Sequence, residues 1–417
     1  MKQVLDLHIH SKYSRACSKN LTLENLDQAC RVKGVDIIAT GDFTYPQWFD
    51  DISSKLEEAK GLYKLKGSDS KVKFILSTEL ALIYKQGERT RRIHIVVLAP
   101  NIAAVAKFNT YLEDHGFNIR SDGRPILGMS AIELCEVLFN IDEKFMVIPA
   151  HIWTPWFAVF GSKSGFDSMA ECFGEYTKHI YAYETGLSSD PEMNWRLSAL
   201  DNLTLTSSSD AHSLPNIARE ANVYDLAEVS YDEIYRIIKE RDTKRILYTI
   251  EFYPEEGMYH YDGHRQCGVR FTPAETKKRK GVCPVCRKKL TIGVDYRVSE
   301  LADRQPGYRP PGAPDYKKLV ELDKIIAAAL DIKSRASQKV QAAYRQIILK
   351  SQTNELDILI DYDLQKLEKI TLPEIVEGIR RVRTGALIIE PGFDGQYGTV
   401  SIFSAGEKAG KQPPRLF

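Results

Sequence analysis

Short apolar runs alternate with helical patterns over the first 250 residues of the chain. Each run is rich in β-branched residues and almost continuously apolar, which is typical of parallel strands covered on both faces. Seven such units predict an α/β fold built as a closed or nearly closed barrel, with a doubly wound sheet as the alternative. In either architecture the functional site lies beyond the carboxyl ends of the strands. The predicted strands cover residues 4–10, 35–40, 72–80, 92–99, 145–150, 180–184 and 203–207, and helical patterns cover 23–33, 52–62 and 131–139.

The pattern changes near residue 250. Residues 254–257 have the composition of a linker, a basic segment rich in Cys and His follows, and residues 304–314 contain too much Pro and Gly for a helix or a central strand. Helical patterns then cover 317–350 and 373–383, and residues 386–403 predict a hairpin. We therefore expect a barrel over 1–253, a basic module rich in Cys and His over 254–303 and a mainly helical C-terminal domain over 304–417.

Composition narrows the class of protein. A chain of 417 residues with 43% hydrophobic residues has ample material for packed cores in more than one domain. The net charge of +1 means that any basic surface is local. Seven cysteines, three of them clustered, suit a reducing compartment with a metal site better than a disulfide framework. We find no signal peptide and no run of about 18 apolar residues, so we expect a cytoplasmic protein without a membrane partner.

Metal-ligand residues recur where the predicted strands end. His8 and His10 lie in the first strand with one residue between them, so their side chains share a face. A single His or Asp at such a place is usually structural, but eight at the same end of the strands are not explained in that way. The other six are Asp42, Glu79, His94, His151, Asp210 and His212. Imidazoles and carboxylates together suit zinc, iron or manganese, and more than four ligands imply a polynuclear site. Two metals about 3.5–4 Å apart are the usual apparatus for in-line displacement at phosphorus.

These residues match, in order, the metal-binding motifs of the polymerase-and-histidinol-phosphatase (PHP) superfamily, which the first 250 residues therefore resemble. The resemblance implies a distorted seven-stranded barrel that hydrolyses phosphoesters at a centre of two or three metals. One motif departs from the superfamily, because its usual Asp-His is here Asp42-Phe43. Phe43 cannot bind a metal, so two ions are expected and a third, held by Asp42 and His212, is the open alternative. Glu184, at the end of the sixth strand, is either a partner of a ligand or structural.

A second set of metal ligands follows residue 253. His264 and Cys267 form one pair with a two-residue spacer, and Cys283 and Cys286 form another. This spacing is typical of a tetrahedral zinc ribbon, and no ligand position is left for water, so the zinc is expected to be structural. His260 is the weaker competitor for His264, since it lacks the spacing to Cys267.

The same segment is strongly basic. Between His264 and Lys289 the sequence has nine Lys or Arg residues and one acidic residue, Glu275. On a zinc ribbon beside a phosphoesterase barrel, such a run favours contact with a phosphate backbone, although charge runs are often only solvated faces. The candidate DNA-binding residues are Lys277, Lys278, Arg279, Lys280, Lys288 and Lys289.

The order of these modules resembles the endonuclease Q family. The resemblance rests on residues 259–267, on Cys283-Pro284-Val285-Cys286 and on residues 300–304 after a PHP barrel, and on the length of the chain. It implies a metal-dependent endonuclease that nicks DNA 5′ of hypoxanthine, uracil, xanthine and abasic sites. It also implies damaged DNA, duplex or single-stranded, as the partner, with a replication clamp as a further candidate; we expect a monomer.

Roles for the ligands follow from the superfamily resemblance. His8, His10, Glu79 and Asp210 are expected to hold one ion and Glu79, His94 and His151 a second, with zinc, magnesium or manganese as candidates. Catalysis is assigned to Asp210, Glu79, Asp42 and His212. Two rivals remain: a small-molecule phosphatase on the same barrel, and a non-catalytic DNA-binding or polymerase-associated subunit.

Aromatic residues follow His151 closely. A lesion cannot be inspected inside a stacked duplex, so the damaged nucleotide is expected to flip into a pocket. Trp153, Trp156 and Phe160 have the side chains to stack on a base there, and the alternative is that they pack the rim of the barrel.

Overall fold

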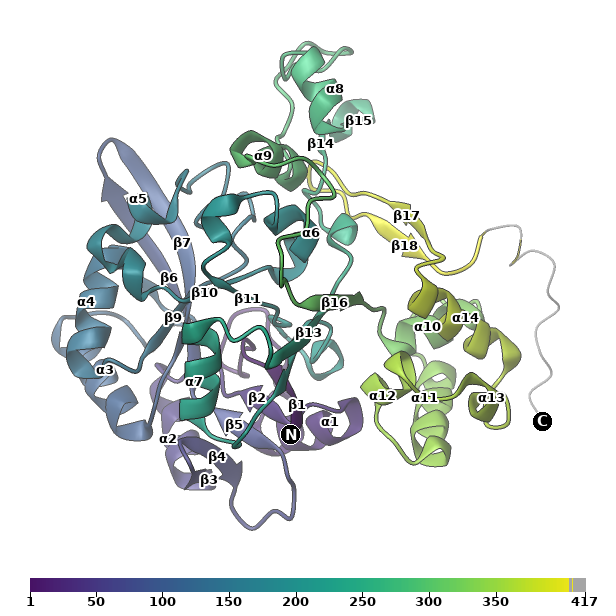
Figure 1. Ribbon diagram of the computed structural model, residues 1–417, viewed down its shortest axis with the longest axis horizontal. Helices are drawn as coiled ribbons and strands as arrows, with labels where there is room; N and C mark the ends of the chain where they lie inside the picture. Colours follow the sequence, from purple (N-terminus) through teal and green to yellow (C-terminus); the bar gives the residue numbers. More distant parts are fainter. Residues whose placement is uncertain (405–406, 408–417) are drawn as a thin grey trace.

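The computed structural model describes residues 1–404 and residue 407, so the remainder of the predicted C-terminal domain lies outside the described residues. Eight strands form the largest sheet, with β1 near its middle (Figure 1). β1 is parallel to β2, and β2 to β5, whereas β12 is antiparallel to β1. In spatial order the strands are β16 (Asp315–Lys318), β13 (Ile246–Glu251), β12 (Ala221–Asp225), β1 (Lys2–Asp6), β2 (Ile37–Ala39), β5 (Lys73–Ile75), β4 (Leu62–Leu65) and β3 (Leu56–Ala59).

Two smaller sheets contain the remaining strands of the α/β region. Four strands lie in the order β8 (Ile126–Leu127), β6 (Ser77–Gln86), β7 (Arg89–Leu98) and β9 (Met146–Pro149). β10 (Ala182–Glu184) and β11 (Thr204–Thr206) form a parallel pair, and β10 lies beside β9. Each of the seven predicted ranges contains a strand, but β1 ends at Asp6, before His8 and His10, and the range 72–80 contains β5 and the start of β6, which belong to different sheets. Helices α1 (Leu23–Lys33), α3 (Ile102–Asp114), α4 (Ala131–Ile141) and α7 (Tyr231–Glu240) lie around these sheets (Figure 1).

Two sequence predictions about this part are wrong. β6 and β7 form a long antiparallel hairpin and β7 is antiparallel to β9, so the strands are not all parallel. The residues between the predicted strands, 81–91, are too few for a parallel crossover, which explains the hairpin. The helix predicted over 52–62 is also absent, because α2 (Pro46–Lys55) ends early and the β3–β4 hairpin follows. Lys60 and Gly61 both have positive φ there, as a tight hairpin turn requires.

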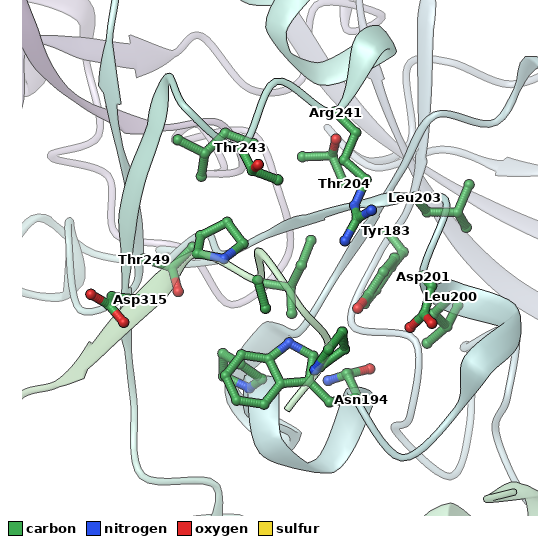
Figure 2. A pocket seen from close by; sticks show the side chains of 17 residues that line it. Tyr183, Asn194, Leu200, Asp201, Leu203, Thr204, Arg241, Thr243, Thr249 and Asp315 are labelled. Carbon is green, nitrogen blue, oxygen red and sulfur yellow. The ribbon is translucent and has the colours of Figure 1, made fainter. Parts of the chain in front are cut away.

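The Pro- and Gly-rich segment 304–314 is irregular, as predicted, and packs against the α/β region. Arg304 forms a two-pronged ion pair with Asp201 of that region. Residues 310–315 help to enclose a small pocket of about 40 Å³ (Figure 2). Tyr183 and Asn194 of the α/β region line the same pocket. This segment is therefore fixed to the α/β region before the chain enters β16.

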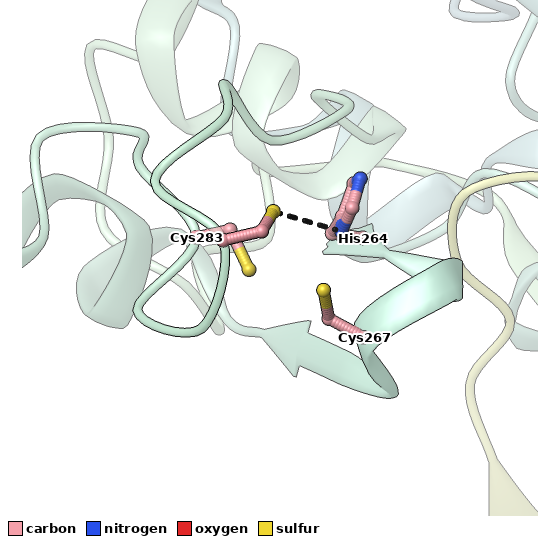
Figure 3. Close-up of side chains that lie close together, drawn as sticks. His264, Cys267 and Cys283 are labelled. Carbon is pink, nitrogen blue, oxygen red and sulfur yellow. Dashed lines mark hydrogen bonds between the residues drawn. The ribbon is translucent and has the colours of Figure 1, made fainter.

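The Cys- and His-rich segment forms a small unit of its own. It contains β14 (Asp262–His264) and β15 (Val269–Phe271), which are antiparallel, and the helices α8 (Pro273–Lys278) and α9 (Val294–Leu301). Its small core is separate from the main one and includes Val269, Cys283 and Leu290. His264, Cys267 and Cys283 face one another in this unit (Figure 3).

The C-terminal region is mainly helical, as predicted. The single pattern expected over 317–350 is in fact the end of β16 followed by two helices, because residues 330–337 break it. The predicted hairpin is present as β17 (Ile388–Glu390) and β18 (Thr399–Ser401). A buried ion pair between Lys33 and Glu355 joins this region to α1. The helices are α10 (Leu322–Ala329), α11 (Gln338–Ser351), α12 (Glu355–Ile360), α13 (Leu364–Leu367) and α14 (Pro373–Thr384). None of the described helices is long and apolar enough to cross a bilayer.

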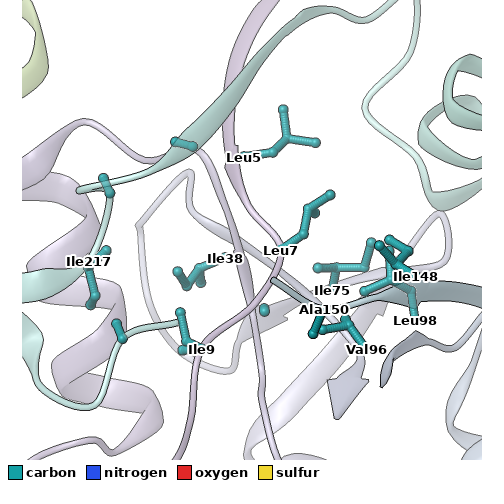
Figure 4. Packing of buried hydrophobic residues seen from close by; sticks show 14 of the residues in the cluster. Leu5, Leu7, Ile9, Ile38, Ile75, Val96, Leu98, Ile148, Ala150 and Ile217 are labelled. Carbon is teal, nitrogen blue, oxygen red and sulfur yellow. The ribbon is translucent and has the colours of Figure 1, made fainter. Parts of the chain in front are cut away.

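Alternation that continues past the end of β1, from Leu5 to His10, separates the core from the candidate site. Leu5, Leu7 and Ile9 are buried among apolar residues of neighbouring strands (Figure 4). His8 and His10 alternate with them and therefore point to the opposite face, where both are fully buried. Two imidazoles are thus held rigidly at the end of a central strand.

Candidate metal centres

Backbone pairing brings the last motif beside the first. Beyond the end of β1, Asp210 donates its backbone N–H to the carbonyl of His8, and His10 donates its backbone N–H to the carbonyl of Ala211. These two bonds are 2.9 and 3.1 Å long. They place the Asp210 side chain against the two imidazoles although two hundred residues separate them in the chain.

His8, His10, Glu79 and Asp210 form the first group of ligand atoms. His10 Nε2 lies 3.2 Å from Glu79 Oε2 and 3.1 Å from Asp210 Oδ1, and His8 Nε2 lies 3.7 and 3.8 Å from the same two oxygens. His8 Nε2, His10 Nε2 and Asp210 Oδ1 are buried, and none has a hydrogen-bond partner within the described residues. Ligands about 2.1 Å from one ion lie about 3.4 Å apart in a tetrahedron, so this donor set fits a divalent cation.

Glu79, His94 and His151 form the second group. Glu79 Oε1 lies 2.7 Å from His94 Nδ1 and 3.2 Å from His151 Nε2. The β6–β7 hairpin and its neighbour β9 create this group, because they carry Glu79 and His94 and lead directly into His151. The two oxygens of Glu79 thus face two different groups of imidazoles, which is the arrangement of a carboxylate that bridges two ions.

Asp42 and His212 are close to the centre but in other positions. Asp42 Oδ1 is 3.0 Å from His10 Nδ1, and its Oδ2 accepts hydrogen bonds from Ser11 and Ser14. Asp42 therefore orients His10, and its oxygens are already occupied. The ring of His212 lies against that of His10 at the exposed edge of the centre, with its Nδ1 2.8 Å from the Asp210 carbonyl.

Glu184 contacts a ligand directly. Both of its carboxylate oxygens lie 3.1 Å from His8 Nδ1, and one of them also accepts the backbone N–H of His151 at 3.0 Å. A hydrogen bond from Nδ1–H leaves Nε2 of His8 as the basic atom directed at the first group.

The pKa shifts reflect the packing of imidazoles against carboxylates. Burial acts to lower the pKa of His8 and His10, but the neighbouring carboxylates raise it well above its usual range. Burial acts to raise the pKa of Glu79, but interactions with His94 and Arg124 lower it well below its usual range. Burial lowers the pKa of His94 to about 4. At neutral pH Glu79 is therefore a carboxylate and His94 a neutral imidazole, whereas a metal would have to displace protons from His8 and His10.

Arg124 also belongs to this site, although no motif pointed to it. Its Nη1 lies 2.9 Å from Glu79 Oε2. It is in a loop between α3 and β8, in the sequence Asp122-Gly123-Arg124-Pro125, which carries no metal-ligand residue at a diagnostic spacing. A sequence signal for this residue is lacking because an arginine in a turn is ordinarily a surface residue.

The second candidate centre lies in the small unit. Ligand atoms of His264, Cys267, Cys283 and Cys286 all lie within 4.8 Å of one another. Cys286 Sγ and His264 Nδ1 are 3.6 Å apart (Figure 3). Zinc–sulfur and zinc–nitrogen bonds of about 2.3 and 2.0 Å give nearly this separation in a tetrahedron. His260, the competitor, is buried away from this group.

One family model and one relative of known sequence match parts of this chain. The family model of the MJ0043 C-terminal domain matches residues 321–386. The relative described as "Uncharacterized protein MJ0043", from Methanocaldococcus jannaschii, is 32% identical over 259 residues. That match covers 60% of this chain but only 31% of the relative, so the chain spans about a third of its length.

Two solved structures are similar to this chain over nearly its whole length. The lesion-specific endonuclease PfuEndoQ from Pyrococcus furiosus superposes with a TM-score of 0.84 and 28% identity, over 99% of this chain and all of the other. A complex of endonuclease Q with a 27-mer duplex substrate that has an abasic lesion at the active site gives the same TM-score at 29% identity, over 97% of each chain. The chain is a structural homologue of endonuclease Q.

The basic residues of the small unit lie at its surface in this endonuclease Q homologue. The six predicted DNA-binding residues are all exposed. Two of them also make contacts within the unit: Lys277 lies over the ring of Tyr296 and Arg279 over that of Phe271. The other four are Lys278, Lys280, Lys288 and Lys289.

The aromatic residues after His151 are divided between core and surface. Trp153 and Phe160 are buried and pack on each other, and the Trp153 indole N–H donates to Asn194. Trp156 is 38% exposed and meets Tyr259 edge to face. Of the three predicted base-pocket residues, this endonuclease Q homologue therefore has only Trp156 at its surface.

Proposed function

We propose that this chain is a metal-dependent DNA endonuclease of lesion repair. It nicks the phosphodiester 5′ of hypoxanthine, uracil or xanthine and of abasic sites, and leaves a 3′-hydroxyl and a 5′-phosphate. The single observation that carries the proposal is the position of Glu79, whose two oxygens face two ligand groups in a chain with the structure of endonuclease Q. The complex of endonuclease Q with an abasic duplex supports the choice of substrate.

Two divalent ions fit the donor atoms. His8, His10, Glu79 and Asp210 would hold one ion, and Glu79, His94 and His151 the other, with zinc, magnesium or manganese as candidates. When bound, such a pair lowers the pKa of an attacking water and stabilises the charge on the departing 3′-oxygen. A third ion is disfavoured, because both oxygens of Asp42 are occupied and the adjacent Phe43 has no donor atom.

The protein's own residues orient the reactants. Glu184 and Asp42 fix the rings of His8 and His10 through Nδ1 and so keep each Nε2 directed into the centre. His212 is assigned to the attacking water, because its Nδ1–H is donated to the Asp210 carbonyl and its Nε2 remains basic. Asp42 and His212, together with Glu79 and Asp210, make up the proposed catalytic set.

The parts of the chain that follow the proposed catalytic region would serve DNA binding. We assign residues 1–253 to a PHP-type barrel, 254–303 to a zinc-ribbon module and 304–417 to a C-terminal domain. A structural zinc on His264, Cys267, Cys283 and Cys286 would hold the basic surface in place. A phosphatase acting on small molecules has no use for such a surface, so the nuclease is favoured over it.

The direct test is incubation with duplexes that contain one hypoxanthine, uracil, xanthine or abasic site, with Mg²⁺, Mn²⁺ or Zn²⁺. We expect a single nick on the 5′ side of the lesion. Its ends should be a 3′-hydroxyl and a 5′-phosphate, which a DNA ligase can join again. An undamaged duplex is the control. Hydrolysis of small phosphate monoesters without any nicking would favour the phosphatase, and no hydrolysis at all would favour a binding subunit.

A further inference from the structure

Arg124 is distinguished from every other cation near the centre. Among the described residues, it is the one Lys or Arg whose side chain forms an ion pair with a proposed ligand, at 2.9 Å from Glu79 Oε2. Arg219 also approaches the centre, but it donates to the backbone carbonyls of Ser209 and Asp210. A permanent positive charge therefore lies beside the carboxylate shared by both ligand groups.

The loop that carries Arg124 is held on both sides. The backbone N–H of Gly123 donates to the carbonyl of Tyr13, and the N–H of Ala81 in β6 donates to the carbonyl of Pro125. A Cβ at Gly123 would lie 2.4 Å from Asp42 Oδ2, so only glycine allows this approach to the centre. The proline after Arg124 restricts its backbone to extended conformations. The guanidinium is thus positioned by the fold rather than by a mobile loop.

Only one arm of the guanidinium is engaged. Nη1 contacts Glu79, whereas the other side-chain N–H groups have no hydrogen-bond partner within the described part of the chain. The side chain is 27% exposed, so it is partly accessible from solvent while it contacts buried Glu79. A planar fork with free donors is the side chain best suited to the oxygens of a phosphate.

We propose that Arg124 contacts a non-bridging oxygen of the scissile phosphate and stabilises the negative charge that develops there. It would be a catalytic residue beyond the metal ligands. This inference rests on the proposed function, because it needs a phosphodiester at the centre. The rival role is structural: Arg124 would only balance the charge of buried Glu79.

The test compares single-turnover cleavage of an abasic duplex by the wild type, Arg124→Ala and Arg124→Lys. The loss of one donor to a developing negative charge typically costs 10²–10³ in rate, so we expect a fall of about 100-fold or more for Arg124→Ala. Arg124→Lys should recover part of the rate, because it restores the charge but not the fork. Arg120→Ala, at an exposed arginine just before the loop, is the control and should stay within about twofold.

Phosphorothioate substrates separate the two roles. Sulfur is placed at either non-bridging position of the scissile linkage, and the ratio of wild-type to Arg124→Ala rates is measured for each diastereomer. We expect that ratio to shrink at least tenfold for one diastereomer, with bound metal per chain unchanged. An equal ratio for the ordinary phosphodiester and for both phosphorothioate diastereomers would overturn the proposed contact. A loss of bound metal that accounts for the lost rate would overturn it too. Wild-type nicking with an unaffected Arg124→Ala would overturn this inference alone, whereas no wild-type nicking would overturn the proposed function with it.

Discussion

His8 and Glu184 form a bifurcated contact, in which both oxygens of the Glu184 carboxylate lie 3.1 Å from His8 Nδ1. The pair is fully buried, and the same carboxylate holds the backbone of His151. Glu184 therefore contacts His8 of the first ligand group and His151 of the second, although it is a member of neither group.

Replacing Glu184 tests this connection. Glu184→Gln keeps the shape but removes the charge, so His8 loses its orienting carboxylate. We expect metal affinity, measured as the Mn²⁺ concentration that gives half-maximal cleavage, to weaken by about 10- to 100-fold. Glu175→Gln, at an exposed position, is the matched control. An unchanged metal requirement would mean that Glu184 is structural.

Replacing Cys283 tests the second centre. Cys283→Ser removes one thiolate of four, and structural zinc contributes on the order of 10 kcal/mol to such units. We expect bound zinc, measured by elemental analysis, to fall by one atom per chain and the small unit to lose protection from proteolysis. Cys135→Ser changes a buried cysteine of α4 that lies outside the group and should keep the zinc. Equal zinc content in both variants would exclude the site.

The basic surface is tested best at four of its six residues, since Lys277 and Arg279 also pack over aromatic rings of the small unit. Changing Lys278, Lys280, Lys288 and Lys289 together to Gln should weaken DNA binding and reduce its salt slope, by about 0.9 for each lost phosphate contact. The unit itself should stay folded, since all four residues are exposed. Changing exposed Lys178 and Lys244 of the α/β region is the control. An unchanged slope would identify the run as a solvated surface.

The two tryptophans after His151 should behave differently. Trp153→Ala is expected to cost about 3–5 kcal/mol of stability, because it leaves a cavity and removes the donor to Asn194 Oδ1. Trp156→Ala should keep the stability but reduce the preference for hypoxanthine over adenine more than it reduces cleavage at an abasic site, which has no base to stack. Thermal unfolding and paired cleavage rates measure the two effects. Equal losses on both substrates would show that Trp156 does not contact the base.

A buried carboxyl group provides a pH test of the fold. Burial raises the pKa of Glu251 to about 8, above the ordinary value near 4.3 that it has in the unfolded chain. Between these values the folded state binds more protons than the unfolded state, so stability falls as the pH rises from about 4.5 to 8. Glu251→Gln removes this dependence and should raise Tm more at pH 8 than at pH 5. Exposed Glu228→Gln should show no such difference, and an equal gain at both pH values would contradict the assignment.

Local patterns predicted most of what lies within single elements. The spacing in His8-Ile9-His10 fixed a shared face, and the two pairs with two-residue spacers identified the second centre, because in each case a short stretch of backbone determines the geometry. Helix α1 was predicted over its full length, since Thr22 caps its start and Gly34 ends it with positive φ.

Relationships between distant segments could not be predicted in the same way. Apolar runs do not reveal strand direction, so the β6–β7 hairpin was missed although Glu79 and His94 were both identified. The position of Asp42 behind His10 depends on Ser11 and Ser14, which have no diagnostic spacing. Arg124 reaches the centre only because Gly123 allows its loop to approach Asp42, a contact that no periodicity encodes.

The most direct test of the account is single-turnover nicking of a duplex with one abasic site by the wild type and by Asp210→Asn. Asp210 supplies a buried oxygen that has no hydrogen-bond partner among the described residues and lies 3.1 Å from His10 Nε2, so Asp210→Asn should remove the charge that holds the first ion. We predict a nick 5′ of the lesion by the wild type, a rate at least 1,000-fold lower for Asp210→Asn, and affinities for the duplex that agree within a few-fold. Nicking by Asp210→Asn at the wild-type rate would contradict the account.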